Sequence, residues 1–277
     1  MTTPSRENEL LAELARQAGM PVIAIAANWQ GEYAVDLDAH AARIFYDVLA
    51  ATIAAEDVRP RELALVVAGQ GGYPAFADAI RRAFSGLGIC YRVYLPCTVD
   101  ASLTLICLGA TQIVLHPFGG LGPLDAGPLI ERSSPDVELC GHGALQLVQR
   151  LLPSSGHSFD TTKISRLQSV QIGPGTALGE VDLKRLGIKA HTAEAEEQDA
   201  LWRLYEHVEH VLGLTRRPQE RFTPSEQWPD EVEFEPATEM IAALICSTAR
   251  RAVLELDTGR PDPDMPRLHG AWHITPE

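Results

Sequence analysis

The sequence predicts an α/β fold in which parallel strands alternate with crossover helices, followed by a helical elaboration. The prediction depends on two observations. Through about residue 130, apolar runs of strand length alternate with segments whose apolar residues recur at helical spacing. One of these runs, at residues 63–68, is also continuous in apolar residues, which is typical of a strand buried on both faces of a parallel sheet. Strand–helix alternation at this spacing favours right-handed crossovers.

The predicted core elements follow one another with clear boundaries. Strands are expected at residues 22–26, 63–68, 89–95 and 113–115, and helices at 38–55, 75–84 and 101–109. Asp36 or Asp38 can cap the first of these helices, because a short acidic side chain accepts hydrogen bonds from the first amides of a helix. Pro74 suits the first turn of the second helix, where its missing N–H is not needed.

The second half of the chain differs from the first. Helices are expected at residues 135–152, 182–186, 194–212 and 236–256, with a long loop at 213–234. An apolar stripe at 201–212 favours packing against the core or a second subunit. The predicted domain organisation is an N-terminal helical or polar extension (1–19), an α/β core (20–130), a helical elaboration of the same domain (131–256) and an irregular tail (257–277).

Composition limits the class of protein. The chain has 277 residues, of which 45% are apolar, and a formal net charge of −14. An acidic chain lacks the basic face that nucleic-acid binding needs. Its longest apolar run, residues 101–115, is short of the about 20 residues that span a bilayer. With no signal peptide recognised, we expect a cytoplasmic protein without a membrane span, whose five cysteines are reduced.

The most informative local feature is a glycine-rich turn. Residues 69–72 read Gly-Gln-Gly-Gly and stand between a predicted buried strand and a helix. Glycines let backbone amides approach a ligand closely, and a helix N-terminus adds partial positive charge. Such a turn can cradle a phosphate, stabilise an oxyanion or bind no ligand. The phosphate motifs do not fit, because GxxxxGK[ST] is missing and Pro74 occupies the last glycine position of GxGxxG. No cofactor is predicted.

Two segments after the turn give the chain a family resemblance. Residues 104–115 read TLICLGATQIVL, and residues 121–125 read LGPLD. Together with Gly71 and Gly72, they resemble the ClpP/crotonase superfamily and, more closely, the serine dehydrogenase proteinase (SDH) family of Clp-fold serine peptidases. The resemblance covers roughly residues 20–255. It implies a ClpP/crotonase-like fold, an oxyanion hole at the two glycines, and assembly into a homo-oligomer or with a related subunit.

The same resemblance raises a question about the nucleophile. The position that it gives to the nucleophilic serine holds Ala101, and the small residues that follow in the family are replaced by Ser102 and Leu103. Alanine has no group that could be activated for acyl transfer. Ser102 could serve instead, but one step along a helix turns a side chain by about 100°, away from a turn that faces position 101.

The general base is left open. The chain has three lysines, and all follow the core motifs: Lys163, Lys184 and Lys189. His116 and Asp125 could complete a triad with Ser102, or they could be a strand-end residue and a turn cap. Cys140 and His142 lack a second ligand pair at zinc spacing, so no metal site is predicted.

Three functions therefore remain open. The first is a catalytically altered Clp-fold protein, marked by Ala101 and Leu103, that acts as a binding or scaffold subunit for a peptide or protein. The second is an active serine hydrolase or peptidase that uses Ser102 with the Gly71 and Gly72 amides. The third is a crotonase-type acyl-thioester enzyme, which needs an enolate-stabilising amide pair and a carboxylate base. The sequence does not place an acidic residue convincingly beside the turn.

Overall fold

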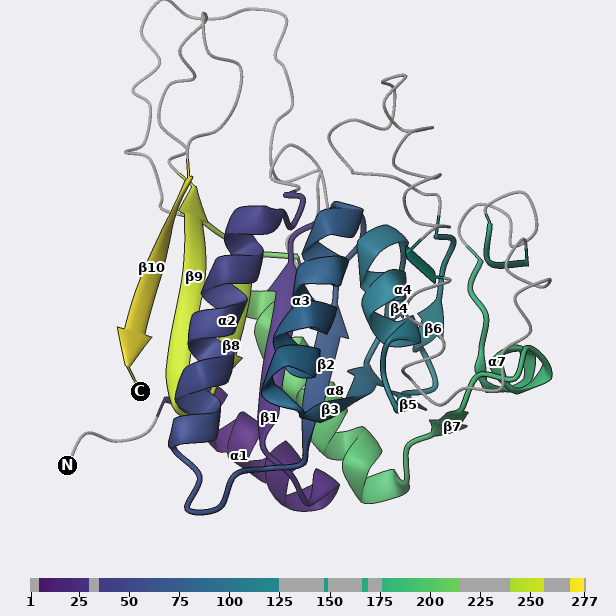
Figure 1. Ribbon diagram of the computed structural model, residues 1–277, viewed down its shortest axis with the longest axis horizontal. Coiled ribbons are helices and arrows are strands. Elements are labelled where there is room, and N and C mark those ends of the chain that lie inside the picture. The colour runs from purple at the N-terminus through teal and green to yellow at the C-terminus, as the bar shows by residue number, and fades with distance from the viewer. Residues whose placement is uncertain are drawn as a thin grey trace, which may run out of the picture.

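The computed structural model describes residues 5–29, 35–124, 147–148, 166–168, 176–214, 240–256 and 270–276. Within these ranges, helices cover both faces of a central sheet (Figure 1). The sheet has eight strands in the order β10-β9-β8-β1-β2-β3-β5-β7. Strands β1, β2, β3, β5 and β7 run parallel to one another, and β8, β9 and β10 are antiparallel additions. The predicted α/β class is confirmed.

The described elements have the following bounds. The helices are α1 (Arg6–Ala18), α2 (Ala39–Ala54), α3 (Pro74–Leu87), α4 (Ala101–Leu108), α7 (Glu180–Arg185) and α8 (Ala195–Val211). The strands are β1 (Val22–Ala27), β2 (Glu62–Ala68), β3 (Cys90–Leu95), β4 (Thr98–Val99), β5 (Gln112–Leu115), β6 (Gly120–Leu121), β7 (Ala190–Thr192), β8 (Met240–Ser247), β9 (Arg250–Leu256) and β10 (Gly270–Pro276). Strands β4 and β6 form a separate two-stranded parallel sheet.

Two hydrophobic cores flank the large sheet. Helices α2, α3 and α4 pack on one face, where Phe45, Phe76 and Ile106 are buried. Helices α1 and α8 pack on the other, where Leu11 and Leu204 are buried. In Figure 1, α2, α3 and α4 lie in front of the strands and α1 and α8 behind them. Because successive side chains of a strand point to opposite faces, β1 and β2 contribute to both cores, which explains their mainly apolar sequences.

The predicted elements of the parallel core are confirmed, and their ends have local causes. The Asp38 carboxylate accepts hydrogen bonds from the amides of His40 and Ala41, at 2.9 and 3.0 Å, and so begins α2. Pro74 is the first residue of α3, and Gly88 ends that helix in the left-handed conformation. Asp36, the other candidate cap for α2, instead accepts a hydrogen bond from the Gly72 amide.

The C-terminal region differs from the structure that the sequence predicts. The helix expected at residues 236–256 is wrong, because the described residues of that segment form the antiparallel strands β8 and β9. A continuous apolar run of this length fits a buried strand as well as a helix, and the pairing of β8 with β1 decides between them. Residues 270–276, expected to be irregular, form β10. The second half therefore extends the sheet in addition to supplying helices.

The apolar stripe of α8 belongs to the core of the chain itself. Leu201, Leu204 and Val208 are fully or almost fully buried in the cluster that α8 forms with α1 and the sheet. These side chains are covered within one subunit. Of the two alternatives for the stripe, packing against the core is confirmed for these side chains.

Some expectations fall largely outside the described residues. These are the helix at 135–152, of which only 147–148 are described, and the loop at 213–234, of which only 213–214 are described. Four cysteines are described, and all are free thiols: Cys90, Cys97, Cys107 and Cys246. In the described part of the chain, every helix is too short or too polar to cross a membrane.

Candidate functional site

The glycine turn follows β2 and leads into α3. Its glycines Gly69, Gly71 and Gly72 have φ angles of 140°, 76° and 84°. These values lie in a region that side chains with a Cβ atom rarely enter, so the backbone path requires glycine. A Cβ atom on Gly72 would also stand 2.3 Å from the Ser102 hydroxyl oxygen. The turn therefore lies in direct contact with the beginning of α4.

Both amides expected to form an oxyanion hole already donate to carboxylates of this chain. The Gly71 amide donates to Asp100 Oδ1 at 2.6 Å, and the Gly72 amide donates to Asp36 Oδ1 at 2.6 Å. Asp100 immediately precedes α4, and Asp36 stands two residues before the Asp38 cap of α2. A carboxylate oxygen carries the partial negative charge that an oxyanion would bring. The turn is thus an anion cradle that the chain fills with its own side chains.

Neither carboxylate is among the site residues that the sequence predicts. Asp100 is adjacent to Ala101, and its place just before a helix was a usable local signal. Asp36 was considered as a helix cap and nothing local connects it with the turn, since it lies 36 residues before Gly72. Its position depends on how α2 packs beside α3 on the same face of the sheet.

Ala101 occupies a strained backbone position. Its φ is 49°, and among the described residues it is the only one other than glycine whose φ is positive. The left-handed conformation costs an ordinary residue about 1–2 kcal/mol, and such strain clusters at functional sites. The Ala101 amide donates to the Pro123 carbonyl at 2.9 Å, which holds the position in place. The backbone at this position is therefore held in a conformation that an ordinary residue avoids, although the side chain is only a methyl group.

Ser102 points toward the turn and not away from it. Its hydroxyl donates to the Gly71 carbonyl at 2.8 Å, and its amide donates to the same oxygen at 3.2 Å. The helical rotation assumed from the sequence does not apply, because the left-handed Ala101 turns the chain at that point. The Ser102 side chain is 1% exposed. Its hydroxyl hydrogen thus serves to fasten the turn to α4.

The next two residues, Leu103 and Thr104, also hold the start of α4 in place. Leu103 is buried in the core, and its Cδ1 atom would lie 3.2 Å from a Cβ atom placed on Gly69. The Thr104 hydroxyl lies 3.2 Å from the carbonyls of Val99 and Gly122, which belong to the β4–β6 region. The start of α4 is therefore held by the glycine turn on one side and the small sheet on the other.

His116 lies on the other side of the large sheet from Ser102. Its ring stacks on Trp202 of α8, with ring centroids 4.7 Å apart, and its Nδ1 atom accepts a hydrogen bond from the Phe118 amide. Burial lowers the pKa of His116. Ser102 and His116 do not hydrogen-bond to each other. The third member of the triad considered, Asp125, lies outside the described residues.

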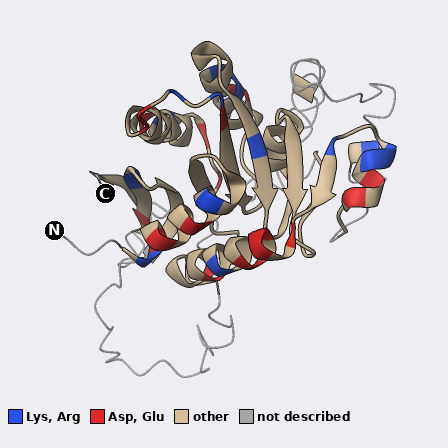
Figure 2. Ribbon diagram, turned by 90° about the horizontal axis from the view of Figure 1, so that it is seen from below, with Lys and Arg blue, Asp and Glu red and all other residues tan. Residues whose placement is uncertain are grey.

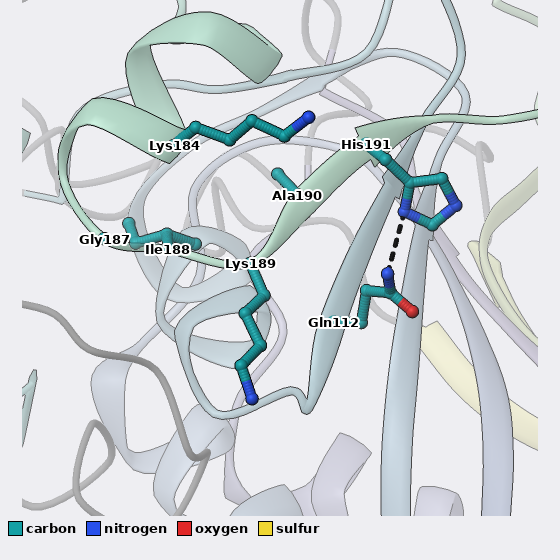
Figure 3. A pocket seen from close by; sticks show the side chains of 7 residues that line it. All are labelled: Gln112, Lys184, Gly187, Ile188, Lys189, Ala190 and His191. Carbon is teal, nitrogen blue, oxygen red and sulfur yellow. Dashed lines mark hydrogen bonds between the residues drawn. The ribbon is translucent and has the colours of Figure 1, made fainter.

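The other candidates are also remote from the turn or outside the described ranges. Lys184 and Lys189 border an open hollow beside β7, together with the Gln112–His191 pair. Their ammonium groups point in different directions, so the hollow has no converging donors (Figure 3). Lys184 also pairs with Glu180. Residues outside the described ranges are Lys163, Cys140 and His142.

Among the described residues, charged side chains and metal ligands add little to the candidate site beyond Asp36 and Asp100. Figure 2 shows that acidic and basic side chains lie mainly on the helices, while the strands carry few of them. Within the described ranges, no three His, Cys, Asp or Glu side chains gather as a metal site would require. The described site is therefore an assembly of backbone amides, two carboxylates and a buried hydroxyl.

No family model matches the sequence, and no curated protein matches it significantly. Solved structures with a similar fold include ClpP1 from Listeria monocytogenes, at 14% identity and a TM-score of 0.43, covering 67% of this chain and 95% of that one. An enoyl-CoA isomerase from M. smegmatis has 14% identity and a TM-score of 0.42, covering 69% and 79%. A putative enoyl-CoA hydratase from Streptomyces coelicolor A3(2) has 16% identity and a TM-score of 0.42, covering 72% and 78%. These similarities concern the fold, and function must be inferred from the residues of this chain.

Proposed function

We propose that this chain is a Clp-fold protein whose catalytic centre is altered, and that it acts as a binding or scaffold subunit for a peptide or protein. The observation that carries the proposal is the occupation of the Gly71 and Gly72 amides by Asp100 and Asp36. Amides that donate to internal carboxylates at 2.6 Å cannot also stabilise a substrate oxyanion.

The residues at the start of α4 support the same proposal. Acyl transfer requires a nucleophile with a base within hydrogen-bond reach. Ala101 has no nucleophilic atom, and the Ser102 hydroxyl donates to a backbone carbonyl, which does not accept its proton in a reaction. The backbone around these residues is nevertheless strained at Ala101 and held by hydrogen bonds. A rigid backbone without an activated nucleophile fits a binding role better than turnover.

A labelling experiment tests the proposal. The purified chain is incubated with a fluorophosphonate probe and, separately, with p-nitrophenyl acetate over a range of pH. We expect no covalent labelling and no ester hydrolysis above that of heat-denatured protein. Ser102→Ala is the matched variant. Labelling of the wild type that disappears in Ser102→Ala would show an active serine hydrolase and overturn the proposal.

A second candidate is favoured by one observation. Acyl-thioester chemistry of the crotonase type needs a carboxylate base beside an amide pair, and Asp36 and Asp100 stand beside these amides. In that reaction a carboxylate would leave the amide, remove a proton from the α-carbon of the acyl group, and let the amides hold the enolate oxygen.

Deuterium exchange separates the two candidates. A short-chain acyl-CoA is incubated with the protein in D2O, and exchange at its α-carbon is followed by NMR. The non-catalytic proposal expects no exchange above buffer. Exchange that is lost in both Asp36→Asn and Asp100→Asn would establish the second candidate instead.

A further inference from the structure

Four aromatic rings form a cluster where the turn after β5 meets α8. The aromatic cluster consists of His116, Phe118, Trp202 and Tyr205. Three of its rings contact one another, with the His116 and Trp202 centroids 4.7 Å apart and the Phe118 centroid 5.4 Å from each of them. The Tyr205 ring lies 5.4 Å from that of Trp202. The proposed catalytic alteration at the glycine turn leaves this cluster without a role.

The aromatic cluster reaches the surface at Phe118. This residue is 67% exposed, Trp202 is partly buried, and His116 and Tyr205 are buried. A single exposed apolar side chain is ordinary on a protein surface. An exposed ring that continues into a partly buried set of rings is different, because it offers aromatic surface at one defined place.

The turn that carries Phe118 is held firmly. The Gly119 amide donates to the His116 carbonyl at 2.7 Å and closes a turn whose second residue is Pro117, a residue favoured there. The Phe118 amide donates to His116 Nδ1 at 3.3 Å. A Cβ atom on Gly119 would stand 2.3 Å from the Leu95 carbonyl, so the turn packs directly against the end of β3. A ring held in this way has little order left to lose when a ligand binds.

Acidic side chains accompany Trp202 along α8. The helix contains five carboxylates and one guanidinium: Glu196, Glu197, Asp199, Glu206, Glu209 and Arg203. The guanidinium of Arg203 is already paired, with Glu13 and Asp199. Glu206 is exposed and stands one helical turn after Trp202, on the same face. Negative charge beside the rings therefore favours a cationic ligand over a neutral or an acidic one.

The rings themselves favour a cation as well. The face of an aromatic ring carries partial negative charge, and Trp attracts a cation more strongly than Phe or Tyr does. Burial lowers the pKa of His116, so at neutral pH its ring is uncharged and does not repel a cation. The Tyr205 hydroxyl hydrogen-bonds with Glu209, which adds a further carboxylate to the border of the cluster.

We propose that the aromatic cluster binds an arginine side chain of a peptide or protein partner. The guanidinium lies on the surface of Phe118 and Trp202 and donates to the Glu206 carboxylate. Arginine fits better than lysine, because its planar group stacks on a ring and donates to a carboxylate in a fork. The formal net charge of −14 also attracts a basic segment from a distance.

This inference rests on the proposed function, because it describes the partner of the proposed binding subunit. The two can nevertheless fail separately. The labelling experiment reports on Ser102, which lies on the other side of the large sheet, and it gives the same answer whether or not the aromatic cluster binds arginine. Loss of the present inference would leave that result unchanged.

Fluorine NMR of the chain labelled with 5-fluorotryptophan tests the inference. The sequence has four tryptophans, and Trp202→Phe identifies the resonance of Trp202. The probe is N-acetyl-Gly-Arg-Gly-amide, and the same peptides with citrulline or leucine in place of arginine are the controls. Citrulline keeps the shape of arginine without its charge. We expect the arginine peptide to shift the Trp202 resonance saturably and the control peptides to leave it in place.

Three outcomes of the titration overturn the inference. The first is no shift with the arginine peptide. The second is an equal shift with citrulline or leucine, which would indicate an apolar docking surface. The third is a shift that follows protein concentration without any peptide, which would identify a second copy of the chain as the occupant.

Substitutions with matched controls locate the site. Phe118→Leu keeps an apolar side chain without the ring and should weaken binding about two- to five-fold, as an exposed cation–π contact implies. Tyr46→Leu is its control, since Tyr46 is 46% exposed on α2, on the opposite face of the sheet. Glu206→Gln should also weaken binding, whereas Glu56→Gln, which removes the same charge from an exposed position, should not. Unchanged binding by both Phe118→Leu and Glu206→Gln, or equal losses in the controls, overturns the inference.

Discussion

The Asp36 carboxylate and the Gly72 amide are joined by a hydrogen bond of 2.6 Å between residues 36 positions apart in the chain. Together with the Asp100–Gly71 hydrogen bond, it connects three loops that follow the carboxyl ends of parallel strands: those before α2, α3 and α4. The glycine turn is therefore held by acidic side chains on both of its inner amides. This arrangement makes the stability of the turn, as well as its chemistry, dependent on the two aspartates.

Removal of the Asp36 carboxylate should destabilise the fold and create an empty anion site. We expect Asp36→Ala to lower the free energy of unfolding by about 1.5–2 kcal/mol, the lower part of the range for a hydrogen bond to a charged group, because Asp36 is partly exposed. Added acetate or formate should recover part of this loss by binding the vacant amide. Urea unfolding with and without the anion measures both effects.

The exposed Asp57 provides the control for this prediction. Asp57→Ala should change the free energy of unfolding little, and acetate should act on it as on the wild type. Equal responses of the Asp36 and Asp57 variants to the anion would contradict the importance of the Asp36–Gly72 bond.

Gly72→Ala should be strongly destabilising for two separable reasons. The φ of 84° imposes a strain of about 1–2 kcal/mol on alanine, and the new methyl would overlap the Ser102 hydroxyl oxygen at 2.3 Å. Addition of Ser102→Ala removes the overlap and leaves the strain. The double variant should thus be more stable than the sum of the two single losses predicts. Thermal or urea unfolding of the four proteins gives this coupling.

Gly86→Ala is the matched control for a glycine replacement. Gly86 lies in α3 without positive φ, and a Cβ atom there meets no heavy atom within 4 Å. Alanine should stabilise the helix by about 0.5–1 kcal/mol. A Gly72→Ala variant that behaves like Gly86→Ala would show that the turn is not as tightly packed as described.

A buried carboxylate on α1 should make stability depend on acid pH. Burial raises the pKa of Glu7, but the hydrogen bond with His207 and the positive charge of Arg251 outweigh it, so the pKa lies below its usual range. Because the folded-state pKa is depressed, Glu7 stabilises the fold above its unfolded-state pKa of about 4.3 and loses this effect as the pH falls through the folded value. Glu7→Gln should therefore reduce stability at neutral pH and flatten its acid dependence.

Urea midpoints measured between neutral and acid pH provide the readout. Glu9→Gln, on the same helix, is the control, because the Glu9–Arg6 pair is exposed and such pairs contribute little. Parallel acid profiles of the wild type and Glu7→Gln would contradict this prediction.

The cysteines near the glycine turn and in the core should be unreactive. Burial raises the pKa of Cys97 to about 11 and raises that of Cys107 still further. Since the thiolate is the reacting species, both should resist iodoacetamide at mildly alkaline pH, while the exposed Cys90 should react. Peptide mass spectrometry of the native and denatured chain measures this. Rapid modification of native Cys97 would show that the turn opens in solution.

The parallel core could be predicted because its signals are local. Strands β1, β2, β3 and β5 are mainly apolar runs bounded by breakers, and Asp38 and Pro74 mark helix starts in the sequence itself. The segment at 240–256 could not be assigned in this way. Its apolar run suits either a buried helix or a buried strand, and the neighbouring strand β1 determines which one forms.

Some features of the candidate site could likewise be predicted from the sequence, and others could not. The glycine turn and the alanine at position 101 can be read from the sequence, because both depend on residue type at one place in the chain. The folded chain is needed to see that Asp36 and Asp100 occupy the two amides and that Ser102 faces the turn. These contacts join loops about 30 to 36 residues apart, and a left-handed backbone at Ala101 reverses the direction that helical periodicity assigns to its neighbour.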